Sequence, residues 1–191
     1  MHCMNVVRKA SPRAAWSALA PDEHSVQIYG HDNTFLDTLE GFVTGGILAG
    51  EGVVVIATAA HLHDLEKRLR SNAWLQLDRA RWEERYIALL AQEVLDRFMV
   101  DGRPDEARFE ATVQPLLARA RAGRRKMRAF GEMVALLWGQ GNAPAALELE
   151  RLWSALIKRE RFALFCAYPR SCLDGDDESL QSVCGAHSRM I

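Results

Sequence analysis

The chain lacks the motifs that mark nucleotide hydrolases and serine hydrolases. It has no Gly-x-x-x-x-Gly-Lys-[Ser/Thr] loop and no Gly-x-Gly-x-x-Gly turn, so ATP hydrolysis is not expected. The pair Gly45-Gly46 ends a predicted helix and precedes a strand, which is the wrong order for a phosphate cradle at a helix N-terminus. No Gly-x-Ser-x-Gly elbow is present, so an α/β-hydrolase triad has no nucleophile.

Cysteines, net charge and long apolar runs are also scarce. Four cysteines are too few and too scattered for a disulfide framework, which predicts free thiols in a reducing cytosol. The 24 basic and 25 acidic residues leave a net charge of −1, without the basic excess of a nucleic-acid-binding protein. No apolar run approaches the ~20 residues of a membrane helix, and no secretory signal opens the chain. We therefore expect a cytoplasmic protein whose partners include neither nucleic acid nor a membrane.

What the chain does contain is an alternation of strand and helix patterns. Residues 1–22 show no periodicity and predict a flexible N-terminal arm, and residues 23–191 predict a single domain. Strand patterns occupy residues 25–29, 52–58, 86–90, 127 to about 130 and 162–168. Apolar residues recur at helical spacing around residues 35–47, 62–69, 94–99, 109–117 and 149–156. Such alternation predicts an α/β fold, in which a mostly parallel sheet carries helices on both faces.

The ends of the predicted strands offer a candidate binding site. In an open α/β sheet, ligands bind outside the carboxyl ends of the parallel strands. Glu132 and Tyr168 fall at two such ends, and Cys166 lies just inside one. We predict a pocket for a small, partly apolar ligand, with Glu132 as its main polar anchor. The residues expected to line it are Tyr29, Thr58, Glu132 and Tyr168.

Two of these features also have structural explanations. Glu132 could cap a helix or form an ion pair with Arg128 or Lys158, and the sequence leaves this alternative open. Cys166 is flanked by apolar neighbours inside a strand, where a free cysteine is usually an inert small hydrophobe. The basic cluster at residues 119–128 is interpreted as a solvated helix end rather than a phosphate-binding patch.

Histidines and cysteines suggest a metal site only weakly. His61 and His63 project from different faces of a predicted helix, so they cannot share an ion easily. Cys184 and His187 are spaced to chelate one ion, and Cys166 or His24 could complete its shell if the C-terminal tail folds back. The sequence cannot show that these segments converge. We therefore interpret the tail as a surface segment and predict no stoichiometric metal.

Five segments, taken in order, resemble the MEDS family, the sensory domain named for methanogens, methylotrophs and the dichloromethane-metabolism regulator. The resemblance extends roughly over residues 22–189 and implies a relative of RecA/KaiC-like domains that lacks the phosphate loop. The final residues 183–188 resemble the closing segment of the family. The five segments are residues 24–29, 50–58, 85–86 with 98–102, 128–138 and 166–169.

The resemblance implies a cytoplasmic, non-catalytic sensor of small ligands such as hydrocarbon derivatives, without a cofactor. Because the chain ends soon after the domain, we expect any output to need a histidine kinase or transcription regulator in trans. The family pattern offers as site candidates His24, Glu132, Cys166, Cys184 and His187. Topology places His24, at the start of its strand, at the opposite sheet edge from Glu132.

Two other classes of function remain as alternatives. One is a degenerate RecA-like enzyme that binds or hydrolyses nucleotides, with Glu132 as general base. The other is a pure protein-interaction module anchored by Trp138 and Trp153, because tryptophan is enriched at binding hot spots. Both tryptophans lie on apolar helical stripes, which favours core packing for each.

Overall fold

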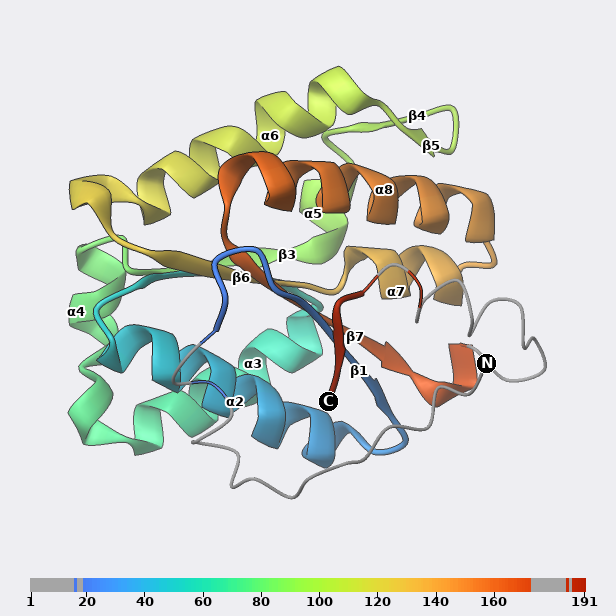
Figure 1. Cartoon of the computed structure of the whole chain (residues 1–191). Coiled ribbons are helices and arrows are strands. Elements are labelled where there is room, and N and C mark those ends of the chain that lie inside the picture. The colour runs from blue at the N-terminus through green and yellow to red at the C-terminus, as the bar shows by residue number, and fades with distance from the viewer. Residues whose placement is uncertain (1–15, 17–18, 173–184, 186) are drawn as a thin grey trace.

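A six-stranded parallel sheet forms the centre of the molecule (Figure 1). The computed structural model describes residue 16, residues 19–172, residue 185 and residues 187–191. The strand order is β3-β2-β6-β7-β1-β8, which confirms the predicted α/β fold with a mostly parallel sheet. The strands are β1 (His24–Tyr29), β2 (Gly52–Ala57), β3 (Tyr86–Leu90), β6 (Met127–Gly131), β7 (Ala163–Pro169) and β8 (Arg189–Met190), with a separate antiparallel pair of β4 (Met99–Val100) and β5 (Arg103–Pro104).

Helices cover both faces of the sheet, as predicted. One face carries α2 (Asp32–Leu48), α3 (Ala59–Ser71) and α4 (Leu77–Trp82). The other carries α5 (Ala91–Leu95), α6 (Glu106–Ala120), α7 (Met133–Gly139) and α8 (Ala143–Glu160). Short 3-10 turns are η1 (Ala73–Leu75), η2 (Ala122–Arg124) and η3 (Arg170–Cys172). Among the described residues, no helix combines the length and the apolar character needed to cross a membrane.

Alternation along the strands divides the core in two. Successive side chains of a strand point to opposite faces of the sheet. On β7, Phe165 and Ala167 therefore pack toward α2 and α3, whereas Leu164, Cys166 and Tyr168 pack toward α8. All six residues of β2 are buried, as expected for a parallel strand covered on both faces. Cys166 and Tyr168 thus lie on the face opposite α2 and α3.

The connections reverse direction between β2 and β6. From β2 the chain passes through α3 to the edge strand β3, whereas from β6 it passes through α7 and α8 to β7 on the other side. The helices after β2 and β6 lie on opposite faces. Because β2 and β6 are neighbours in the sheet, their carboxyl ends form a topological switch point, where open α/β sheets bind ligands.

The helix predicted around residues 94–99 is shorter than expected. Helix α5 ends at Leu95, and Met99 already belongs to β4. Phe98 is buried from the connecting segment, where its ring meets that of Phe109 edge-on at 5.4 Å. The apolar residues at 94–99, whose spacing predicted one helix, therefore belong to one helical turn and to the tight hairpin that follows it. This hairpin has positive φ at Asp101 and Gly102.

One residue of the predicted N-terminal arm belongs to the core. Trp16 is buried, and its ring centroid lies 5.1 Å from that of Phe42 and 5.3 Å from that of Phe165. Its carbonyl oxygen accepts a 3.2 Å hydrogen bond from the guanidinium of Arg128, which also pairs with Glu51 at 2.6 Å. Residue 16 therefore packs with the domain, and Arg128 has a carboxylate partner other than Glu132.

Gly46 allows close packing of α2 on the sheet. A Cβ atom added to Gly46 would lie 2.6 Å from a methyl group of Val53 and 2.9 Å from the Arg128 side chain. Only glycine permits α2 to approach β2 and β6 this closely at that position. Gly46 is thus explained by helix–sheet contact.

Candidate functional site

Glu132 lies at the topological switch point and joins β6 to the β2–α3 connection. Its backbone N–H donates to the carbonyl of Ile56 at 2.9 Å, which extends the pairing of β6 with β2 past the end of the strand. Its buried carboxylate accepts a 2.8 Å hydrogen bond from the N–H of Thr58 through Oε2. The other oxygen, Oε1, lies 2.6 Å from Nδ1 of His61. Both carboxylate oxygens are therefore occupied by the protein itself.

His61 is positioned by the first turn of α3. Thr58 is the N-cap residue of that helix, and its hydroxyl accepts from the N–H of His61 at 3.4 Å. Burial on its own lowers the pKa of His61, but the hydrogen bond and the negative charge of Glu132 outweigh it and raise the pKa above its ordinary value. The pair is accordingly an imidazolium and a carboxylate over a wider pH range than a free histidine would allow.

Aromatic rings form an apolar wall beside this pair. The Phe35 ring meets the His61 ring edge-on at 4.9 Å, and Tyr29 stacks on Phe35 at 4.7 Å. Burial, followed by the charge of Glu132, raises the pKa of Tyr29, so its phenol stays neutral. The histidine–carboxylate pair therefore lies beside two aromatic rings at the carboxyl ends of the strands. We call Tyr29, Phe35, Thr58, His61 and Glu132 the switch-point site.

A second cluster lies on the α8 face of the sheet. Nε2 of His24, at the start of β1, lies 3.4 Å from Sγ of Cys166 on β7. The same nitrogen lies 3.7 Å from Oε2 of Glu150, which projects from the buried side of α8. The hydroxyl of Tyr168 donates to Oε1 of Glu150. Two neighbouring strands and one helix thus bring an imidazole, a thiol and a carboxylate together out of contact with solvent.

The C-terminal segment adds a fourth group, because its His187 side chain is buried although residues 188–191 are exposed. The side chain of His187 has 0% relative exposure, its Nε2 lies 3.5 Å from Oε1 of Glu150, and its ring centroid is 4.0 Å from that of His24. The segment is held because Ser188 and His24 exchange hydrogen bonds and β8 pairs with β1. A short edge strand therefore returns His187 to the sheet, which local sequence patterns cannot show.

Burial dominates the electrostatics of this second cluster. It raises the pKa of Glu150 to about 7, although the hydrogen bond from Tyr168 acts in the opposite direction. Burial, and then the charge of Glu150, raise the pKa of the Cys166 thiol well above its ordinary value. Oε2 of Glu150 is buried and accepts no hydrogen bond from the described residues. We call His24, Glu150, Cys166 and His187 the four-residue cluster.

The structure divides the residues that the sequence assigned to one pocket. Tyr29, Thr58 and Glu132 meet at the switch-point site, whereas Tyr168 lies on the other face with His24 and Cys166. Cys184 falls outside the described residues.

Three residues of these sites were missed, namely Phe35, His61 and Glu150, and Phe35 was predicted only as part of the apolar face of its helix. His61 lies three residues after the N-cap Thr58, so it belongs to the first turn after a strand end. Glu150 falls on the buried stripe of α8 between Ala146 and Trp153. A carboxylate on an otherwise apolar stripe indicates a buried polar contact, and the sequence shows this pattern.

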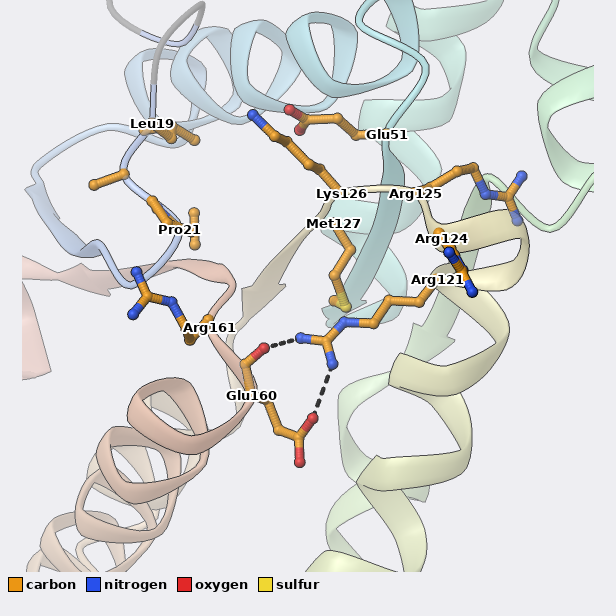
Figure 2. Close-up of a pocket in the computed structure, with 12 residues that line it drawn as sticks. Leu19, Pro21, Glu51, Arg121, Arg124, Arg125, Lys126, Met127, Glu160 and Arg161 are labelled. Atoms are coloured by element: carbon orange, nitrogen blue, oxygen red, sulfur yellow. Dashed lines mark hydrogen bonds and ion pairs between the residues drawn. The ribbon is translucent and has the colours of Figure 1, made fainter.

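A third feature is a cleft of about 270 Å³ at the amino-terminal edge of the sheet, beneath the starts of β6 and β7 (Figure 2). Its lining includes four basic residues, Arg121, Arg124, Arg125 and Lys126, and two acidic residues, Glu51 and Glu160. Arg121 donates to the side chain of Glu160 at 2.8 Å and also to its carbonyl, so it ties the end of α6 to the end of α8. The basic cluster therefore has a structural role here, and acidic residues offset part of its charge.

The model of one protein family matches most of the chain. The family is described as MEDS, the MEthanogen/methylotroph, DcmR Sensory domain, and the match extends over residues 23–188. The comparisons with curated proteins and with solved structures gave no match. The matched range includes every residue of the switch-point site and of the four-residue cluster.

Proposed function

The chain belongs to the MEDS family of sensory domains, and we propose that it binds a small hydrocarbon-derived ligand at the switch-point site and reports it to a signalling partner. The sensory role follows from the family. One observation above all supports the location. Glu132, Thr58 and His61 meet at the carboxyl ends of the paired strands β2 and β6, whose following connections run in opposite directions. No catalytic step is part of this proposal.

The contacts suggest separate roles for Glu132 and His61. Both oxygens of Glu132 are engaged by Thr58 and His61, so Glu132 orients the site instead of meeting the ligand directly. The imidazolium of His61 is then the group that donates to a polar atom of the ligand, such as an alcohol or carbonyl oxygen. The apolar body would lie beside the partly exposed His61 ring, which the buried Phe35 ring supports from the core. This refines the sequence prediction that Glu132 is the main polar anchor.

The output surface is proposed to lie at the far end of α3. Helix α3 leads through η1 to α4. The turn η1 carries Trp74 and the helix α4 carries Trp82, and these side chains have 87% and 85% relative exposure. Exposed tryptophans are typical of protein-binding hot spots, whereas Trp153, a sequence candidate for that role, is buried in the core. We propose that a histidine kinase or transcription regulator docks here. Ligand should therefore change amide hydrogen exchange in residues 72–85, and unchanged exchange there would contradict this surface.

Ligand identification is the decisive experiment. Gently purified protein is analysed by native mass spectrometry for a retained small molecule, and a thermal-shift panel then tests short alcohols, aldehydes, ketones and halogenated hydrocarbons. A ligand at a hundredfold excess over Kd should stabilise the folded state by about 2.7 kcal/mol. His61→Ala should abolish the shift, whereas His63→Ala, on the exposed face of the same helix, should keep it. An equal shift in both variants would reject the site.

Glu132 variants test its orienting role. Glu132→Gln keeps an acceptor for the N–H of Thr58 but removes the charge that holds His61 protonated. We expect weaker binding in Glu132→Gln and none detectable in Glu132→Ala. If Glu132→Ala binds an identified ligand as well as the unmodified protein does, the assignment of Glu132 is wrong.

The enzymatic alternative has less support, because the family is sensory and Gly46 is explained by its packing against Val53 and Arg128. It is tested by phosphate release from ATP or GTP in the presence of Mg²⁺. Release that is lost in Glu132→Gln would replace the sensory proposal by a nucleotide hydrolase with Glu132 as general base.

A further inference from the structure

We propose that His24, Glu150, Cys166 and His187 bind one Zn²⁺, or a similar borderline-soft divalent ion, between β1, β7, α8 and the returning C-terminal segment. The site lies on the α8 face of the sheet, so it is separate from the switch-point site and does not depend on the proposed ligand. It departs from the sequence prediction of no stoichiometric metal, because the structure brings together segments whose convergence the sequence cannot show.

The spacing of the four groups fits a tetrahedral ion. Each residue offers one ligand atom, and these four atoms lie within 4.8 Å of one another. Zinc–ligand bonds of about 2.0–2.3 Å imply edges of roughly 3.3–3.8 Å between neighbouring ligand atoms. With Oε2 of Glu150 as the carboxylate ligand, two contacts match these edges: 3.4 Å (His24 to Cys166) and 3.7 Å (His24 to Glu150). His187 lies 3.5 Å from the other oxygen, Oε1. Any separation among the four ligand atoms that exceeds these edges, up to the 4.8 Å limit, would have to close by side-chain adjustment when the ion binds.

The chemistry of the groups selects the kind of ion. Two imidazole nitrogens, one sulfur and one carboxylate oxygen form a mixed set that suits Zn²⁺ better than Mg²⁺ or Ca²⁺, which prefer oxygen ligands alone. A thiolate of Cys166 and a carboxylate of Glu150 would together neutralise the two positive charges of the ion. The interior location therefore leaves no net charge to be solvated.

An ion would also resolve the electrostatic problem of the cluster. Among the described residues, the Tyr168 hydroxyl donates to Oε1 of the buried Glu150 carboxyl, and Oε2 accepts no hydrogen bond. The buried Cys166 thiol lies in the same group of side chains. A bound cation would be a partner for both groups, since a coordinating thiol is deprotonated outright. Tyr168 would then orient the Glu150 carboxylate, as outer-shell partners of metal ligands do.

Metal content of the full chain is the first test. Protein purified without chelators is analysed for elements, then stripped and titrated with Zn²⁺ and separately with Co²⁺. We expect near one ion per chain. His187→Ala should lower the affinity by more than roughly 100-fold, which is the upper end for losing an outer-shell partner. His63→Ala is the matched control, because it removes an exposed histidine outside the cluster and should retain the ion.

Cobalt absorption tests the sulfur ligand. The Co²⁺ protein should show a thiolate-to-cobalt charge-transfer band that Cys166→Ser removes and Cys172→Ser, which alters a partly buried thiol outside the cluster, keeps. Circular dichroism confirms that each variant is folded, and His187→Ala keeps the test valid if Cys166→Ser does not fold. Folded, stripped protein that takes up neither ion, or uptake that is equal in His187→Ala and the unmodified chain, would overturn the proposal. Because His187→Ala leaves the switch-point site intact, a ligand-induced thermal shift that persists in this variant separates failure of the metal site from failure of the proposed function.

Discussion

Glu132 and Glu150 are two buried carboxylates on opposite faces of one sheet, and they differ in their partners. Glu132 has a backbone N–H donor and a histidine whose pKa it raises, so the fold favours a charged pair. Glu150 has a tyrosine hydroxyl, two histidines at 3.5 Å and 3.7 Å, and a pKa raised to about 7 by burial. Both carboxylates are buried, but only Glu132 has partners that favour its charged form, whereas burial favours the neutral form of Glu150.

The difference indicates what each site can do. The switch-point site is electrostatically complete without a bound ion, so its charge is available to orient a ligand. The four-residue cluster is incomplete in that sense, because among the described residues no lysine or arginine pairs with its buried carboxyl and thiol. A buried acid that lacks a cationic partner tends to be protonated or to bind a metal. Variants that remove each carboxylate or its partner in turn test whether the two sites differ in this way.

The largest effect is expected from Glu132→Ala. It leaves the Thr58 N–H and the His61 imidazole without their acceptor in a mostly buried position. Removing one partner of a buried ion pair typically costs about 3–5 kcal/mol in the free energy of unfolding. Urea unfolding at pH 6 measures it. Glu132→Gln, which still accepts from Thr58, should lose less, and equal losses in both variants would mean that the charge on Glu132 is unimportant.

His61→Ala should give the next largest loss, and one that depends on pH. A hydrogen bond to a charged group contributes about 1.5–3 kcal/mol. Because the folded-state pKa of His61 is raised above 6.5, chiefly by Glu132 with smaller contributions from Asp32 and Asp64, this stabilisation is complete below pH 6.5. It is lost as the pH rises through the folded-state pKa. The difference in unfolding free energy between the unmodified protein and His61→Ala should therefore shrink from pH 6.5 upward.

The matched control for that experiment is His63→Ala, whose side chain is exposed two residues further along α3. Its difference from the unmodified protein should stay small and flat with pH. A His61→Ala loss that grows toward alkaline pH would show that the histidine is neutral in the folded state and would contradict the charged pair.

The sheet could be predicted from the sequence because its strands are strongly apolar. The unbroken β-branched run of β2 and the apolar β7 both predict buried parallel strands, and the structure places them there. Short elements were missed for a physical reason. The α4 turn and the β4–β5 hairpin are too short for apolar periodicity to identify, and the helix predicted around residues 94–99 is reduced to the single turn of α5.

The site could be predicted only where strand ends determine it. Glu132 and Thr58 follow neighbouring strands, so parallel pairing alone brings them together. Tyr168 also lies near a strand end, but its side chain points to the other face, and a count of residues from the end decides this. Return of the tail beside β1 depends on pairing between segments more than 160 residues apart, such as the hydrogen bonds of Ser188 with His24. No local pattern encodes that contact.

Tyr168→Phe tests the single hydroxyl that serves Glu150. In chelator-treated protein it removes the donor to Oε1 and leaves a buried acceptor, which should cost about 1–2 kcal/mol. Urea unfolding measures the loss. In zinc-loaded protein the same substitution should weaken metal affinity by roughly 10–100-fold, as expected for an outer-shell partner. If unfolding and metal affinity are both unchanged, Tyr168 does not orient the carboxylate.

The smallest effect, and the sharpest contrast with Glu132, is expected for Glu150→Gln in chelator-treated protein. The amide has nearly the same shape and still accepts from Tyr168, while it removes a carboxyl whose ionised form burial penalises. Because burial raises the pKa of Glu150 to about 7, the carboxyl is mostly protonated at pH 6, so a neutral amide should change the unfolding free energy by no more than about 1 kcal/mol. A loss as large as that of Glu132→Ala would instead mean that His24 or His187 is a charged partner of Glu150. In that case the cluster would already be neutralised within the protein, and its need for a metal ion would disappear.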